Sequence, residues 1–364
     1  MNKILSIIIP RYRESKKTVM QLLTSINNQN GIDFNEIEVI ISQDGPQQNE
    51  VIEPLVFNEE IIDILNFPIQ LFQLESNKGP GMVRQYAIDN STGKYIMFCD
   101  ADDIIHSVGV LDAFLTEIKE TGADMIMAPW MREEIDELGN RSYIIQQNDN
   151  TWLFGKVFKR EFLVNNNIRF VDDISYAHED SYFNSLVNGL VKSVKEIQML
   201  SYLWKYNQDS ITHKNNRIYY FETADEWIKA VVKSFEELEK RGFSELHYKV
   251  CQLMCYTYFI TQLPYWNLPE TALYREKIES TFKEKIEPFY HYFKETNIEF
   301  FTTIYCEERA KIFNNEIEME TFVQWLMRLG IEQMPMPVQE LTIEDLQTLQ
   351  AQGVNLEELG IQIQ

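Results

Sequence analysis

Short apolar runs alternate along roughly the first 130 residues with longer segments in which large apolar residues recur every three or four positions. The short runs are rich in isoleucine and typical of buried strands, and the longer spacing is typical of helices with one apolar face. The expected strands are Ile4–Ile9, Ile37–Ile41, Ile69–Leu74 and Tyr95–Cys99, and the expected helices are Ser15–Asn28 and Gly79–Asn90. Repeated strand–helix–strand units predict an α/β fold with a doubly wound, mainly parallel, Rossmann-like sheet.

The pattern changes twice after this region. Residues 150–213 are mixed, with strands expected at Phe154–Phe158 and Ser201–Tyr206 and a helix at Asp180–Asn188. From about Arg217 the spacing is strongly helical, with helices expected at Glu226–Lys240, Ser244–Leu263, Pro269–Thr296 and Ile317–Arg328. We expect an α/β domain over residues 1–215, a helical domain over 216–333 and an acidic amphipathic tail over 334–364 that holds a short helix, Thr342–Gln352.

Composition narrows the class of protein. The chain of 364 residues has 33 Lys and Arg against 56 Asp and Glu, a net charge of −23. This charge repels nucleic-acid backbones and anionic lipid on average, although a few side chains could still form a local basic pocket. The four cysteines are too few and too scattered for a disulfide framework, and no apolar stretch approaches the length of a membrane span. We expect a soluble, cytoplasmic protein with a sizeable core.

Acidic side chains follow two of the expected strands. Asp44 follows the second strand, and Asp100, Asp102 and Asp103 follow the fourth. The carboxyl ends of the strands form the ligand-binding edge of a doubly wound sheet, so these side chains are expected at that edge. Carboxylates this close repel one another, and Mg²⁺ or Mn²⁺ would offset the repulsion and bind a ligand's phosphates. The simpler alternative is a solvated acidic turn that caps the next helix.

A glycine-rich helix start lies between these acidic segments. Gly79 and Gly81 let the backbone approach a ligand closely, and a helix N-terminus favours an anion. Arg84, about one turn into the helix, could reach a phosphate or the acidic loop. The spacing is not that of a P-loop, and such helix starts are common. Asp44 could belong to an ordinary turn or accept a hydrogen bond from the imide N–H of a pyrimidine base.

The acidic pair Glu179 and Asp180 opens the helix expected after His178. A carboxylate at this place could simply cap the helix, because the helix dipole stabilises negative charge at its N-terminal end. It could also act as a general base that takes a proton from an attacking hydroxyl group. The residues alone leave both alternatives open.

Taken together, these segments occur in the order found in family 2 glycosyltransferases of the GT-A fold, and the chain resembles that family over about residues 3–213. The matching segments are 6–10, 43–45, 77–84, 93–103, 155–160, 178–180 and 210–212. Arg11 and Arg13, and Gln85 in the glycine-rich helix, depart from the usual family pattern. The chain lacks a Gln-x-x-Arg-Trp motif, which argues against a processive membrane synthase.

The resemblance implies inverting transfer from a nucleotide-diphospho-sugar, most often a UDP-sugar, with Mn²⁺ or Mg²⁺. It implies that Asp180 is the catalytic base and that Glu179 or His178 orients the acceptor or the donor. Asp102 would be the chief metal ligand, with Asp100 on the ribose or the metal and Asp103 in support of the metal or the sugar. The residues expected to contact the donor or its diphosphate are Pro10, Tyr12, Asp44, Asn77, Lys78, Gly79, Arg84, Asp100, Ala101, Asp102 and His213.

The expected function is transfer of a hexose or N-acetylhexosamine to a hydroxyl of a cell-envelope glycan, a teichoic-acid-like polymer, a lipid-linked saccharide or a protein. One alternative is a glucosyltransferase that acts on modified DNA bases, which the net charge disfavours. Another is an inactive nucleotide-sugar-binding module, which the intact acidic segments disfavour. The helical domain could cover the acceptor site, mediate homo-oligomerisation or dock a partner, and the acceptor or a partner could hold the protein at the membrane periphery. Epimeric sugars differ by one hydroxyl, so the sequence does not identify the sugar.

Overall fold

The chain divides into two compact units, Met1–Asn216 and Arg217–Gln364. The computed structural model describes residues 3–46, 57, 59–136, 138–147, 151–207, 218–243, 245–261, 271–294 and 322–331. His213, the expected helix Thr342–Gln352 and the expected tail over 334–364 lie outside the described residues. Within the described ranges, no helix is both long enough and apolar enough to cross a membrane.

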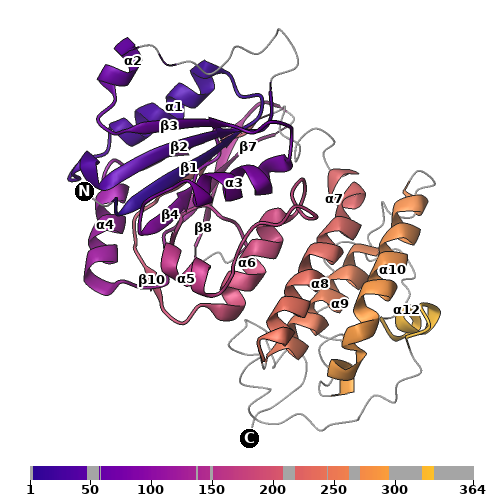
Figure 1. Ribbon diagram of the computed structural model, residues 1–364. Coiled ribbons are helices and arrows are strands. Elements are labelled where there is room, and N and C mark those ends of the chain that lie inside the picture. The colour runs from indigo at the N-terminus through magenta and orange to yellow at the C-terminus, as the bar shows by residue number, and fades with distance from the viewer. Residues whose placement is uncertain are drawn as a thin grey trace, which may run out of the picture. The chain divides into compact units, whose positions relative to one another are not determined.

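A seven-stranded sheet with the order β10-β6-β9-β4-β1-β2-β3 forms the centre of the first unit (Figure 1). Its strands are β1 Leu5–Arg11, β2 Ile37–Gln43, β3 Ile69–Gln73, β4 Tyr95–Phe98, β6 Met125–Met127, β9 Lys156–Lys159 and β10 Val194–Glu196. Neighbouring strands are parallel except at β9, which runs antiparallel to β4 and to β6. The expected mainly parallel α/β sheet is therefore confirmed.

Helices cover both faces of this sheet. They are α1 Lys16–Asn27, α2 Glu59–Ile64, α3 Gly79–Asp89, α4 Val110–Thr121, α5 Arg160–Asn165 and α6 Glu179–Leu190. On one face, Ile7 of β1 belongs to a buried cluster with Leu22 of α1 and Phe114 of α4. On the other face, the ring centroid of Phe98 in β4 lies 5.8 Å from that of Phe183 in α6. The two buried faces explain why the strands are apolar at nearly every position.

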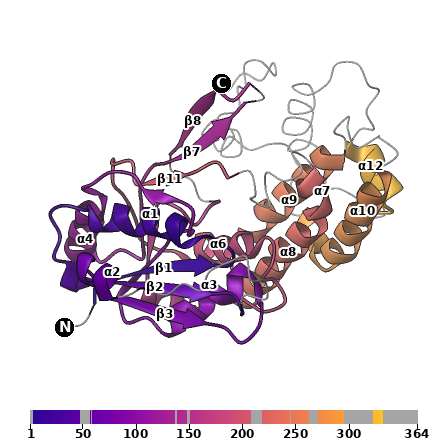
Figure 2. The same cartoon turned by 90° about the horizontal axis from the view of Figure 1, so that it is seen from above.

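The first unit also contains a second sheet, which has four strands. Its strands are β5 Ile104–Ile105, β7 Trp130–Ile135, β8 Arg141–Gln146 and β11 Tyr202–Trp204, in the order β5-β11-β7-β8. Figure 2 shows β7 and β8 extending away from the seven-stranded sheet. Only residues 99–103 separate β4 in one sheet from β5 in the other, so the acidic loop is the junction between the two sheets.

The strand order β3-β2-β1-β4 brings the carboxyl ends of β1, β2 and β4 to one edge of the seven-stranded sheet. The pairs Leu5↔Ile37 and Leu5↔Tyr95 align β1 with β2 and β4, and all three strands run in the same direction. Their carboxyl ends, which precede residues 12, 44 and 99, therefore lie along one edge. The chain changes direction across the sheet between β1 and β4, and such a switch point is where doubly wound sheets bind ligands.

The second unit is helical in its described residues, as expected. Its helices are α7 Ile218–Glu222, α8 Ala224–Lys240, α9 Leu246–Thr261, α10 Ala272–Ile286 and α12 Phe322–Arg328, with a 3₁₀ helix at Glu287–Lys294. Glu279 of α10 accepts hydrogen bonds from Arg328 at 2.7 Å and from Trp325 at 3.1 Å, both in α12, and from Arg275 at 3.2 Å. These bonds outweigh the effect of burial and hold the pKa of Glu279 below its usual value.

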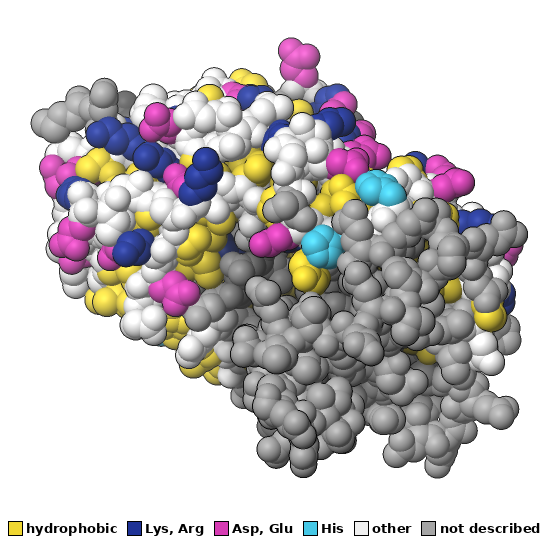
Figure 3. Space-filling view, turned by 90° about the horizontal axis from the view of Figure 1, so that it is seen from below, with side chains coloured by type: hydrophobic (Ala, Val, Ile, Leu, Met, Phe, Trp, Pro, Cys, Tyr) yellow, Lys and Arg dark blue, Asp and Glu magenta, His cyan; other side chains and the backbone are white. Residues whose placement is uncertain are grey.

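Charged side chains of both signs are visible on the face shown in Figure 3, where Lys and Arg lie interspersed with Asp and Glu among the described residues. The acidic side chains among the described residues of this view are therefore not gathered into one field. The charges close to the carboxyl ends of β1, β2 and β4 are therefore more informative about ligand binding there than the net charge of the chain.

Candidate active site

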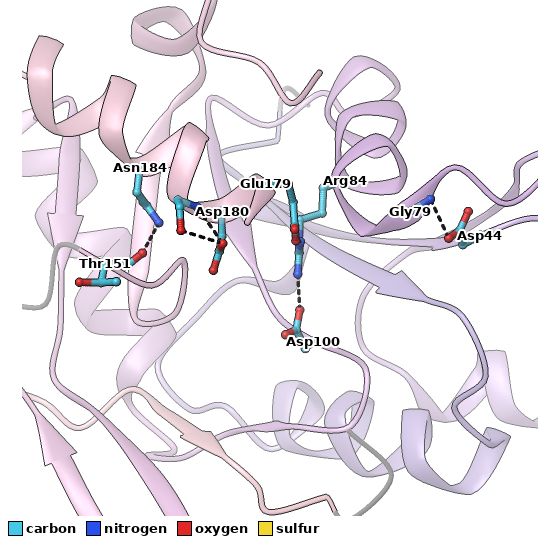
Figure 4. A network of polar contacts seen from close by, with 9 residues as sticks. Asp44, Gly79, Arg84, Asp100, Thr151, Glu179, Asp180 and Asn184 are labelled. Atoms are coloured by element: carbon cyan, nitrogen blue, oxygen red, sulfur yellow. Dashed lines mark hydrogen bonds and ion pairs between the residues drawn. The ribbon is translucent and has the colours of Figure 1, made fainter. Parts of the chain in front are cut away.

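Asp44 holds the start of α3 at the end of β2. Its two carboxylate oxygens accept hydrogen bonds from the backbone N–H groups of Lys78 at 2.6 Å and Gly79 at 3.0 Å (Figure 4). Burial raises the pKa of Asp44 even though both bonds work in the opposite direction. The carboxylate satisfies backbone donors that a helix start leaves without partners. This capping contact was not expected from the sequence.

Arg84 connects the acidic loop to the start of α6. The side chain is buried, and it lies 2.7 Å from Glu179 through Nη1 and 2.8 Å from Asp100 through Nη2 (Figure 4). Burial disfavours the charged guanidinium, but the carboxylates of Asp100 and Glu179 outweigh it and raise the pKa of Arg84. Arg84 is therefore a permanent cation shared by two acidic segments that are distant in the sequence.

The three carboxylates of the acidic loop point to different partners. The loop is a turn in which the N–H of Asp103 donates to the carbonyl of Asp100 at 3.2 Å. Asp100 pairs with Arg84, and Asp102 accepts a hydrogen bond from Asn207 at 2.8 Å. Asp103 is 0% exposed, and its two oxygens accept from Tyr202 Oη at 2.7 Å and from a backbone N–H at 2.8 Å.

This divergence bears on one expectation. Asp103 was expected to support the metal or the sugar, and the structure turns both of its oxygens into the protein. Among the described side chains, no group of three or more His, Cys, Asp or Glu residues could hold a metal ion. Burial, together with the charge of Asp100, raises the pKa of Asp102. Two carboxylates with excess negative charge suit a Mg²⁺ or Mn²⁺ ion that takes its other ligands from phosphates and water.

Glu179 and Asp180 lie in the first turn of α6, beside Arg84. His178, which precedes them, adopts a left-handed conformation with φ 59° and ψ 20° that few residues other than glycine adopt, and it turns the chain into the helix. Burial and the neighbouring Asp180 charge raise the pKa of Glu179 to about 7, against the effect of Arg84. Burial also raises the pKa of Asp180, whose Oδ1 accepts from the N–H of Ser181 at 2.7 Å. A carboxylate with a raised pKa is well matched to proton transfer near neutral pH.

The start of α3 and the chain before α6 are in direct contact. The N–H of Gly81 donates to the carbonyl of Ser175 at 3.1 Å, and the Tyr176 hydroxyl donates to the carbonyl of Asn77 at 3.0 Å. A Cβ atom added to Gly79 would lie 2.3 Å from the Ser175 oxygen, which is closer than atoms can approach. Glycine is therefore required here by close packing as well as by the positive φ of Gly79, 81°.

The end of β1 and the loop after it contain two further charged residues, Arg11 and Glu14. Arg11 is buried and donates to Gln43 at 2.5 Å and to the carbonyl of Glu14 at 2.8 Å, so it ties β1 to β2. Burial raises the pKa of Glu14, and the nearby charge of Asp102 adds to the effect. Glu14 was not expected from the sequence, because a single glutamate before a helix resembles an ordinary surface residue.

The structure places the remaining expected donor contacts along this edge, with one exception. Pro10 is the next-to-last residue of β1, and Tyr12 follows the strand with 43% of its surface exposed. Asn77 and Lys78 precede α3. Ala101 is buried within the acidic loop. His213 lies outside the described part of the chain.

Residues 6–176 match the family described as glycosyl transferase family 2. This segment is a family 2 glycosyltransferase domain. The family 2 domain contains every acidic strand-end residue discussed above, and Glu179 and Asp180 follow within a few residues of its matched end.

Two named relatives come from Staphylococcus aureus. The chain is 24% identical to poly(ribitol-phosphate) beta-N-acetylglucosaminyltransferase TarS of strain Mu50 over 364 residues, which cover 94% of this chain and 52% of that protein. It is 26% identical to the enzyme of the same description named TarP, of strain N315, over 261 residues that cover 66% of this chain and 76% of TarP. The chain thus spans about half the length of TarS.

The fold agrees with that of a solved structure. The crystal structure of S. aureus TarS residues 1–349 in complex with UDP-GlcNAc superposes with a TM-score of 0.56 at 17% identity, covering 87% of this chain and 98% of that one. This likeness confirms the GT-A fold expected for the family 2 domain, followed by a helical C-terminal portion.

Proposed function

We propose that this chain is an inverting, metal-dependent glycosyltransferase that moves N-acetylglucosamine from UDP-N-acetylglucosamine to a hydroxyl group of a polyol-phosphate polymer. The observation that carries the proposal is the convergence of Arg84, Asp100, Asp102, Glu179 and Asp180 at one edge of a family 2 domain. The names of TarS and TarP support the sugar and the acceptor class, and the TarS complex supports the donor.

The donor would lie along the carboxyl edge of β1, β2 and β4. Each oxygen of Asp44 uses one lone pair on a backbone N–H, and a second lone pair can accept the imide N–H of uracil. Pro10, Tyr12 and residues 77–79 flank that position. We also keep Ala101 and His213 as proposed donor contacts.

A Mn²⁺ or Mg²⁺ ion would be held chiefly by Asp102, with Asp100 in support. Such an ion stabilises the negative charge that develops on a departing diphosphate. Arg84 neutralises Asp100 and Glu179 but not Asp102, so the acidic loop keeps an unbalanced charge that a cation can offset.

Asp180 would be the catalytic base. Oδ1 is engaged by Ser181, so we assign proton transfer to Oδ2. The acceptor hydroxyl loses its proton to Asp180 while its oxygen bonds to C1 of the sugar, and the C1–O bond breaks with its electron pair leaving on the diphosphate. Attack from the face opposite the leaving group inverts the configuration at C1, through an oxocarbenium-like transition state. Glu179 would orient Arg84 and the substrates around this centre.

A donor panel tests this proposal. Thermal shift is measured with UDP-N-acetylglucosamine, UDP-glucose and GDP-mannose, each with Mn²⁺ and with EDTA, and transfer to poly(ribitol phosphate) is then followed by mass spectrometry. We expect a Mn²⁺-dependent shift with the UDP-sugars, and transfer with inversion from UDP-N-acetylglucosamine. Absence of any nucleotide-sugar binding would contradict the proposal, whereas transfer to a different polymer would correct only the acceptor.

A further inference from the structure

Strand β11 supports the acidic loop through contacts that are separate from those of Arg84. Tyr202 of β11 is 0% exposed, and its hydroxyl donates to Asp103 Oδ2 at 2.7 Å and accepts from the N–H of Asp100 at 2.8 Å. One hydroxyl therefore contacts both the first and the last residue of the turn 100–103. Removal of this hydroxyl would take one partner from the partly buried N–H of Asp100 and one from the buried carboxylate of Asp103.

The residues after β11 continue the same support. The N–H of Lys205 donates to the other oxygen of Asp103 at 2.8 Å, and the side-chain amide of Asn207 donates to Asp102 at 2.8 Å. β11 also pairs with β5, which follows the loop directly, through Tyr202↔Ile105. The loop is thus fixed at its beginning, at its end and at the side chain of Asp102.

We propose that Tyr202 and Asn207 are positioning residues that hold the carboxylates of Asp100 and Asp102 in the geometry needed to bind the cation. This inference rests on the proposed function. Hydrogen-bond partners behind metal-binding side chains fix their orientation, and loss of such a partner typically weakens metal binding about 10–100-fold. Asp103 serves in this arrangement as the anchor that receives Tyr202, which explains why a third acidic residue is present without facing the ligand edge.

The test compares two tyrosines that each make a buried hydrogen bond in the first unit. Tyr202→Phe removes the contact with the loop, and Tyr95→Phe removes a hydroxyl that donates to the carbonyl of Ala123 at 2.7 Å. UDP is titrated into the full chain by calorimetry at a series of Mn²⁺ concentrations and in EDTA. We expect Tyr202→Phe to raise the Mn²⁺ concentration for half-maximal UDP affinity about 10–100-fold, and Tyr95→Phe to leave it unchanged. UDP affinity in EDTA should be the same in all three proteins.

The outcomes separate the two claims. A wild-type protein without Mn²⁺-dependent UDP binding would overturn the metal-dependent proposal and this inference together. Wild-type binding that Tyr202→Phe and Tyr95→Phe both retain would overturn the inference alone.

A second pair of variants covers the case in which Tyr202→Phe does not fold. Asn207→Ala removes the bond to Asp102, and Asn166→Ala removes a comparable amide contact to the carbonyl of Phe162 at 2.8 Å. We expect weaker Mn²⁺-dependent UDP binding only for Asn207→Ala. Equal binding by both asparagine variants would contradict the role of Asn207.

Discussion

Each unit of the chain contains a network of arginine and carboxylate groups with at least one buried member, and the two networks have opposite charge balances. In the first unit one arginine, Arg84, serves two carboxylates, Asp100 and Glu179. In the second unit one carboxylate, Glu279, is contacted by Arg275 and Arg328. The pKa of Glu279 is held below its usual value, whereas that of Glu179 is raised to about 7, chiefly by burial.

The difference separates a network that holds helices together from one that is suited to chemistry. Excess donors around Glu279 stabilise its charge and so stabilise the packing of α10 against α12. The carboxylates around Arg84 outnumber it, so they repel one another and their charged forms are destabilised. Such an arrangement is found mainly where a site binds a proton or a cation. The direction in which a buried carboxylate is shifted is thus informative about its role.

Asp180→Asn tests the first network most severely. It removes the proposed proton acceptor while keeping the size of the side chain, so transfer should fall about 10²–10⁴-fold. UDP-sugar binding should be unchanged, because Asp180 does not contact the donor in the proposal. Initial rates and calorimetry measure the two quantities, with Asp89→Asn, a surface carboxylate paired with Arg169, as control. Near-normal transfer by Asp180→Asn would rule out Asp180 as the base.

Asp102→Ala should abolish the Mn²⁺-dependent binding of UDP. Loss of a residue that only hydrogen-bonds to a metal ligand can weaken metal binding about 100-fold, and loss of the ligand itself should weaken it at least as much. Because Asp102 does not pair with Arg84, the fold and the Arg84 network should stay intact. Calorimetry with and without Mn²⁺ measures the effect, and circular dichroism checks the fold. Unchanged Mn²⁺ dependence would refute the role of Asp102.

Arg84→Lys and Arg328→Lys compare the two networks directly. A lysine keeps the charge but has no planar fork, so it cannot reproduce the two-sided contact of Arg84. We expect Arg84→Lys to lower kcat about 10²-fold through misplacement of Asp100 and Glu179. Arg328→Lys should leave kcat unchanged. A similar fall in kcat for both variants would contradict the distinction between the networks.

The pH dependence of transfer should report on Asp180 and on its neighbour Glu179. Because burial raises the pKa of Asp180 above its usual value, the transfer rate should fall as the pH is lowered through that raised pKa. In Glu179→Gln the charge of Arg84 is shared only by Asp100 and Asp180. The pKa of Asp180 should therefore be lower, and the fall in rate should move to lower pH. A kcat/KM profile from pH 5 to 8 checks this, and an unmoved profile would contradict it.

The pKa shifts of Glu179 and Glu279 have opposite consequences for the pH dependence of stability. The pKa of folded Glu179, about 7, exceeds its unfolded value, so the folded state binds more protons between about pH 4.3 and 7. Wild type should therefore lose stability relative to Glu179→Gln as the pH rises through this window. For Glu279, whose pKa is lowered, the stabilisation is present above the unfolded value and is lost as the pH falls below it. Urea unfolding at several pH values measures both trends.

Arg328→Ala should have the smallest effect, a loss of about 1 kcal/mol in the unfolding free energy of the second unit. The guanidinium of Arg328 is partly exposed, and Glu279 keeps Arg275 and Trp325 as partners. UDP binding should not change. A fall in UDP affinity would show that the second network also serves the donor site.

The sequence predicts well which residues lie at the carboxyl edge of the sheet. It predicts poorly which side chains contact one another there. Isoleucine-rich runs followed by acidic turns are local signals, so Asp44 and Asp100 could be placed at strand ends without coordinates. The bond between Tyr202 and Asp103 joins residues 99 positions apart, and no local pattern encodes it. For the same reason the sequence did not predict that β9 enters the sheet antiparallel, or that Asp103 turns inward while Asp102 does not.

The close packing of Gly79 against Ser175 has a consequence for engineering. The start of α3, which Asp44 caps, and the segment that precedes α6 meet at Gly79 without room for a methyl group. Substitutions at Gly79 or Gly81, chosen to accept a new nucleotide, would therefore also shift the chain that leads into α6, where the proposed base Asp180 lies. Laboratory evolution of donor preference should therefore spare these two positions and diversify the exposed Tyr12 instead.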